Sequence, residues 1–128
     1  MAKNLNFGNV VLCEHVIAGD RSKHTLINVF SGDVIVEELP NVLLFGFFAE
    51  FKPDTLQEID ILLNVFLEKE MIGQITGKVS PKKLEEVGTI VIPSFPVSVQ
   101  KDTYLNVIAS SDGYRDKEIL KKKIFQQS

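Results

Sequence analysis

Apolar and polar residues alternate from Glu58 to Lys69 with a period of two, which no helix can match. The alternation separates a set expected to face a core from a set expected to face outward; the inward set is Ile59, Ile61, Leu63, Val65 and Leu67. A two-residue spacing places every member of one set on the same face of an extended strand. The stretch therefore predicts a β-strand with one buried face.

The same period recurs on both sides of this stretch, in segments that end at residues typical of turns. Residues 8–18 and 24–30 are predicted to form a hairpin, and residues 34–36, 42–52, 71–79 and 114–125 are further predicted strands. Gly73 and Gly77 weaken the 71–79 segment, so we expect an edge strand there. Residues 81–86, which follow Ser80, allow at most one short helical turn.

Two prolines interrupt the alternation between Thr89 and Ser110. Pro93 and Pro96 have no amide hydrogen, so neither can donate to a strand ladder. We therefore expect the chain to change sheets at residues 93–96 and to turn back at residues 100–103.

These segments predict an all-β protein, a two-sheet antiparallel sandwich of immunoglobulin-like or related Greek-key type. The chain has 128 residues and no low-complexity linker or long repeat, which favours one domain. We expect a flexible N-terminal arm over residues 1–6, the sandwich over 7–125 and a loose C-terminus over 126–128.

Composition limits the location and the partners that we expect. One cysteine cannot close an internal disulfide, and no segment is apolar enough for a secretory signal or a membrane span. The formal net charge is -3, which disfavours nucleic acid and anionic membranes as partners. We predict a cytoplasmic protein, in a bacterial cell or, if phage-encoded, in its host.

Cys13, His15 and His24 are the candidates for metal binding or thiol catalysis. Cys13 and His15 are two residues apart on a predicted strand, so they share a face. Zinc needs three or four converging ligands, and a thiol nucleophile needs an oriented base, and the sequence supplies neither set clearly. We predict no catalytic, cofactor-binding or metal-binding residues and a non-enzymatic protein, with a metal or thiol enzyme as the alternative from another class.

A basic segment lies near the C-terminus, at Lys121, Lys122 and Lys123. Such an edge can bind phosphate groups of nucleic acids. Lysines on an edge strand also prevent sheets from pairing edge to edge. The acidic net charge favours this second interpretation.

The predicted strands carry more apolar residues than one core face requires. Phe48, Leu62, Phe66 and Ile108 fall on the face opposite the expected core. Exposed apolar patches mark sites of protein contact. We therefore predict a protein-protein interaction module that acts through an apolar sheet face or edge and binds a protein partner or itself, as in a homodimer.

Three segments resemble a family of short uncharacterised bacterial and phage proteins, a domain-of-unknown-function family. They are VLCEHV, HTLINVFSGDVIVEELPNVLLFGFFAEF and IVIPSFPVSVQKDTYLNVIASSDGYRDKEILKKKIF, and together they span roughly residues 8–125. The resemblance implies a small β-sandwich without a known activity, and it suggests a phage-encoded or accessory inhibitor of a host protein as an alternative function. The chain departs from the family at Lys101-Asp102-Thr103, where a Pro-Gly pair is common.

Overall fold

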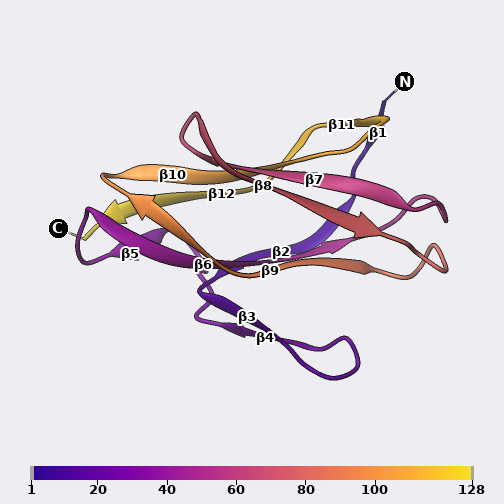
Figure 1. Cartoon of the computed structure of the whole chain (residues 1–128), viewed down its shortest axis with the longest axis horizontal. Coiled ribbons are helices and arrows are strands. Elements are labelled where there is room, and N and C mark those ends of the chain that lie inside the picture. Colours follow the sequence, from indigo (N-terminus) through magenta and orange to yellow (C-terminus); the bar gives the residue numbers. More distant parts are fainter. Residues whose placement is uncertain (1, 128) are drawn as a thin grey trace.

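A computed structural model of the chain describes residues 2–127, and all of its regular elements are strands (Figure 1). The strands are β1 (Lys3–Asn4), β2 (Phe7–Cys13), β3 (His15–Ala18), β4 (His24–Ile27), β5 (Val34–Val36), β6 (Asn41–Phe51), β7 (Ile59–Leu67), β8 (Glu70–Val79), β9 (Gly88–Val99), β10 (Thr103–Ser110), β11 (Tyr114–Arg115) and β12 (Lys117–Gln126).

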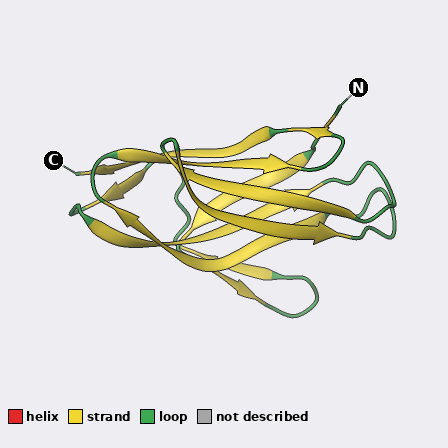
Figure 2. Ribbon diagram, turned by 45° about the horizontal axis from the view of Figure 1, so that its top comes forward, coloured by secondary structure: helices red, strands yellow, loops and turns green. Residues whose placement is uncertain are grey.

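Two sheets form the layers of a sandwich (Figure 2). One sheet has five strands in the order β5-β12-β10-β7-β8, and the other has three in the order β2-β6-β9. The remaining strands form two small pairs, β1 with β11 and β3 with β4. Neighbouring strands are antiparallel except β1 with β11 and β5 with β12. The predicted all-β class is confirmed.

The core lies between the two sheets and follows the predicted alternation. Ile61, Leu63 and Val65 of β7 are buried, while Ile59 and Leu67 at the strand ends are partly exposed. The facing sheet contributes the largest fully buried side chains, which are Phe45, Phe47 and Phe51 of β6. Burying one such side chain contributes about 1.5–3 kcal/mol to folding, so β6 is a main source of stability.

The N-terminal segment is attached to the sandwich, in contrast to the expected flexible arm. Leu5 is 1% exposed and belongs to the core. The amide of Lys3 donates to the Gly113 carbonyl (3.0 Å), and Lys117 Nζ donates to the Leu5 carbonyl (3.2 Å). At the other end, the Gln127 amide donates to the Val36 carbonyl (2.8 Å). The expectations for residues 1 and 128 lie outside the described residues.

The hairpin expected over residues 8–30 is divided, because the first segment breaks at Glu14. β2 pairs with β6, whereas β3 pairs with β4 in a separate hairpin that projects from the three-stranded sheet (Figure 1). Gly46 permits this crossing, since a Cβ there would lie 2.8 Å from the Pro93 carbonyl oxygen and 3.0 Å from the Cα of His15. The sequence segment is extended as predicted, but its pairing differs.

The expected change of sheets at Pro93 and Pro96 is wrong. Both prolines lie inside β9, which pairs with β6 on either side of a bulge. β9 is an edge strand of its sheet, so a missing amide hydrogen on its free side costs no ladder bond. The chain instead changes sheets at residues 100–102, between β9 and β10.

Two other predictions concern β8 and the loop after it. β8 is the outermost strand of the five-stranded sheet, which confirms the predicted edge strand. The allowed helical turn at residues 81–86 is reduced to a single bonded turn, in which the Glu86 amide donates to the Lys83 carbonyl (3.1 Å).

Candidate functional site

The four residues of the predicted interaction face do not form one surface. Phe48 lies on β6 in the three-stranded sheet. Leu62 and Phe66 of β7 and Ile108 of β10 lie in the five-stranded sheet, on its outer side. The alternation correctly placed all four on outward faces, but it could not show which sheet each strand would join.

Phe48 is covered by the chain itself. The hairpin of β3 and β4 lies over it, and the rings of His24 and Phe48 pack edge to face with centroids 5.3 Å apart. Val16, on the side of the hairpin that faces the sheet, is 2% exposed. The hairpin therefore covers Phe48, which was predicted to contact a partner.

The outer face of the five-stranded sheet is a mixed polar surface. Leu62, Phe66 and Ile108 are each partly exposed, Met71 opposite Phe66 is 50% exposed, and amide side chains form hydrogen bonds between them. Gln74 Nε2 donates to Asn64 Oδ1 (2.8 Å), and Asn64 Nδ2 donates to Ser110 Oγ (3.4 Å). Asn106 Nδ2 donates to Glu118 Oε2 (3.2 Å). These bonds break the apolar area into separate side chains.

The three lysines near the C-terminus do not form one basic edge. Lys121 lies over the Tyr104 ring at 4.6 Å, and Lys123 lies over the Phe125 ring at 5.3 Å. Lys122 Nζ donates to the Phe30 carbonyl (2.9 Å).

Acidic side chains also surround the outward pair of lysines. Lys121 and Lys123 line a hollow of about 490 Å³ together with Asp33, Glu68 and Asp102. The three carboxylates offset the two ammonium groups, so the hollow has no excess positive charge to attract phosphate.

The residues considered for metal or thiol chemistry are also separated. Cys13 is 0% exposed, and its Sγ contacts the carbonyl oxygens of His15 (3.4 Å) and Gly46 (3.6 Å). Burial raises the pKa of the Cys13 thiol, which opposes the thiolate form that a nucleophile requires. Across residues 2–127, no group of three or more His, Cys, Asp or Glu side chains is arranged to hold a metal ion.

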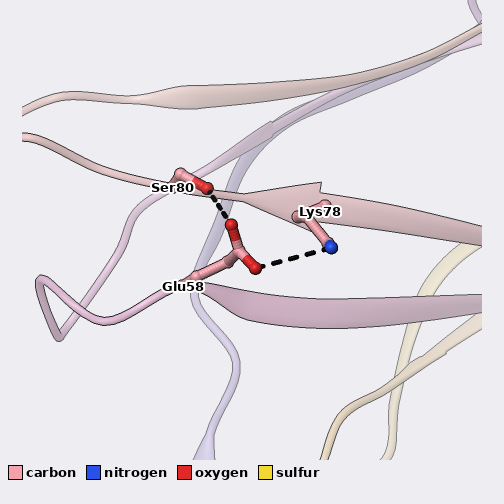
Figure 3. A network of polar contacts seen from close by, with 3 residues as sticks. All are labelled: Glu58, Lys78 and Ser80. Carbon is pink, nitrogen blue, oxygen red and sulfur yellow. Dashed lines mark hydrogen bonds and ion pairs between the residues drawn. The ribbon is translucent and has the colours of Figure 1, made fainter.

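A hollow of about 720 Å³ lies at the end of the sandwich beside β11 and has a polar lining. Tyr114 donates its hydroxyl to Asp54 (2.5 Å), and burial together with this bond raises the pKa of Tyr114 to about 12. At the rim, Glu58 accepts from Ser80 (2.7 Å) and pairs with Lys78 at 3.4 Å (Figure 3). Both contacts lower the pKa of the Glu58 carboxyl. The polar groups here bond to neighbouring loops and strands, which ties this end of the fold together.

Five exposed apolar side chains that sequence reasoning missed lie on the outer side of the three-stranded sheet. β6 presents Val42 (59% exposed) and Leu44 (54%), and the hairpin with the residues after it presents Ile17 (43%), Ile27 (37%) and Val29 (46%). We call these five residues the hairpin face. The alternation in β6 already put Val42 and Leu44 on the outward side. Only the structure shows that β3 crosses β6 at Gly46 and that the hairpin leaves these two side chains uncovered.

The hairpin separates an inner and an outer set of its own side chains. Val16 pairs with Leu26 and packs toward the sheet, whereas Ile17 and Ile27, on the alternate positions, point away from it. The hairpin face therefore has two levels on the outer side of the three-stranded sheet, the sheet surface at Leu44 and the hairpin surface at Ile27.

Comparison with known proteins adds no relative. A scan against models of protein families finds no match, and no curated protein matches the sequence.

None of the residues that the structure describes belongs to a helix long and apolar enough to cross a membrane.

Proposed function

We propose that this protein is a non-enzymatic binding module that contacts another protein through the hairpin face. The observation that supports the proposal is the exposure of five large aliphatic side chains, each between 37% and 59%, on one side of the sandwich. Covering such side chains with a partner removes apolar area from water at about 25 cal/mol per Å². Clusters of this kind are typical of protein contact sites.

The remaining surfaces give weaker support for other functions. The outer face of the five-stranded sheet is interrupted by bonded amides, and the lysines at 121 and 123 lie among carboxylates. The thiol of Cys13 is buried and has a raised pKa. A protein partner remains the occupant that the chemistry of the hairpin face favours.

The finer expectations belong to the same proposal. We place the module in the cytoplasm, and the family resemblance suggests the particular case of a phage-encoded or accessory chain that inhibits a host protein. In that case the hairpin face would cover a functional surface of the host protein.

Site-specific photo-cross-linking tests the proposal. The photo-reactive residue p-benzoylphenylalanine replaces Leu44 in one variant and Ile35 in a control, because Ile35 is 57% exposed but lies on the other sheet. Irradiation of cells that express each variant should give a discrete cross-linked band for position 44 and none for position 35. Equal labelling at both positions, or no band at position 44, would contradict the proposal.

A further inference from the structure

We infer that the partner of the hairpin face is a second copy of this chain, related by a two-fold axis. In this arrangement the hairpin of each copy lies against the β6 surface of the other. The inference rests on the proposed function, since it names the occupant of the same surface.

The two levels of the hairpin face have matching chemistry. Val42 and Leu44 form an aliphatic area on the sheet, and Ile17 and Ile27 form another on the hairpin. A two-fold dimer uses the same patch on both subunits, so each patch must be complementary to itself. In the dimer, the aliphatic hairpin surface of each copy packs on the aliphatic sheet surface of the other. The two-fold axis therefore produces two equivalent contacts, and the patch is complementary to itself.

The charges at the ends of the hairpin face determine the direction of pairing. The turn between β3 and β4 carries exposed Arg21 and Lys23, with Asp20 as the opposing charge. The loop that leads into β6 carries exposed Glu37 and Glu38. Across residues 2–127, the detected ion pair is Lys78 with Glu58, so these cations and carboxylates keep their charges free for a partner.

The positions of these charges suit a two-fold relation. The hairpin turn extends toward one end of the sandwich, and the loop before β6 lies at the opposite end in both views (Figures 1 and 2). A two-fold axis that runs parallel to the three-stranded sheet and across β6 near Gly46 turns the two outer faces toward each other and reverses these ends between copies. Arg21 and Lys23 of each copy then approach Glu37 and Glu38 of the other.

The two kinds of contact have different roles in this dimer. Exposed ion pairs add little affinity, but they fix orientation and reject the reverse arrangement. The aliphatic contacts supply the driving force. Raised salt should therefore weaken the dimer moderately without abolishing it.

Sedimentation equilibrium over a range of concentrations tests the apolar contact. The wild-type chain and an Ile35→Asp control should have twice the 14.3 kDa mass of one chain, and Leu44→Asp should raise the dissociation constant at least about ten-fold. Thermal unfolding shows whether Leu44→Asp is folded, and Ile27→Asp provides a second variant on the hairpin. A wild-type chain that stays monomeric, or a dimer insensitive to both substitutions, would overturn the inference.

Charge exchange tests the direction of pairing. Arg21→Glu with Lys23→Glu should weaken the dimer about three- to ten-fold, and so should Glu37→Lys with Glu38→Lys. Combining all four substitutions should restore the wild-type dissociation constant. A combined variant as weak as either pair alone would contradict the two-fold arrangement.

The cross-linking at position 44 separates this inference from the proposed function. A band at twice the mass of the chain supports both. A band of another mass, with a monomeric wild-type chain, overturns the second copy as partner and leaves a binding module. The absence of any band contradicts both.

Discussion

The two outer faces of the sandwich differ although both are built by the same alternation. On the five-stranded sheet, Leu62, Phe66 and Ile108 stand among amides that form hydrogen bonds with neighbouring side chains. On the three-stranded sheet, Leu44 stands beside a hairpin that crosses at Gly46 and adds exposed aliphatic groups. Hydrogen-bonded polar groups on the first face interrupt the apolar area that a partner could cover, whereas a face that accumulates exposed apolar groups gains free energy when a partner covers it.

The largest effect that we expect comes from filling the crossing point of the hairpin. Gly46→Ala places a Cβ within 2.8 Å of the Pro93 carbonyl oxygen, and backbone atoms cannot move aside as a flexible side chain can. We expect a loss of about 3 kcal/mol in the free energy of unfolding, measured by denaturant titration.

Gly73 provides the matched control for this substitution. It also lies in a strand, but a Cβ there would meet no atom within 4 Å. Gly73→Ala should change the free energy of unfolding by no more than about 0.5 kcal/mol. Equal stability of the two variants would show that the hairpin is not held against the sheet at Gly46.

A smaller effect should separate the inner and outer sides of the hairpin. Val16 is 2% exposed and Ile17 is 43% exposed, although they are adjacent in β3. Val16→Ala removes two buried methyl groups and should lower the free energy of unfolding by about 2 kcal/mol. Ile17→Ala should cost well under half of that in the monomer. The reverse order, measured by the same titration, would contradict the described orientation of the hairpin.

The sequence predicted the strands better than their partners. The period in β7 identified Ile61, Leu63 and Val65 as core residues, because alternation is a local property of the backbone. Sheet membership depends on contacts between residues far apart in the chain, so alternation left Phe48 and Phe66 on one presumed face. Pro93 and Pro96 misled for a related reason, since a proline is compatible both with a break and with an edge strand.

The candidate site was harder to predict than the core. Val42 and Leu44 follow the same pattern as Phe48, and nothing within β6 distinguishes the covered residue from the exposed ones. The difference arises from the crossing of β3, whose place is set by Gly46 and Pro93 together. In the sequence, Gly46 is a glycine within a predicted strand and Pro93 is a proline within a predicted bend. Only the fold brings these two residues into contact.

An intermediate effect should arise on the polar face. Asn106 is 8% exposed, and its Oδ1 is buried without a hydrogen-bond partner among the described residues. A buried acceptor left unsatisfied costs about 1–3 kcal/mol. Asn106→Leu should therefore raise the free energy of unfolding by about 1 kcal/mol, because exposed Glu118 can bond to water in place of the lost amide.

Asn64 is the control for this substitution, since both of its amide atoms are bonded. Asn64→Leu should lower the free energy of unfolding by about 1 kcal/mol. If both leucine variants were destabilised alike, the unsatisfied oxygen of Asn106 would not be the relevant difference between the two positions.

The smallest effect concerns Tyr114, at the polar end of the sandwich. Its pKa is raised to about 12 from a usual 10.0, first by burial and then by the bond to Asp54. Because the folded state holds the proton more tightly than the unfolded state, this stabilisation is complete below pH about 10 and is lost as the pH rises toward about 12. Absorbance titration should show a tyrosinate step near pH about 12, and Tyr114→Phe should remove that step. If the step persists in the Tyr114→Phe variant, the hydroxyl of Tyr114 is not the group whose proton is held by burial and by Asp54.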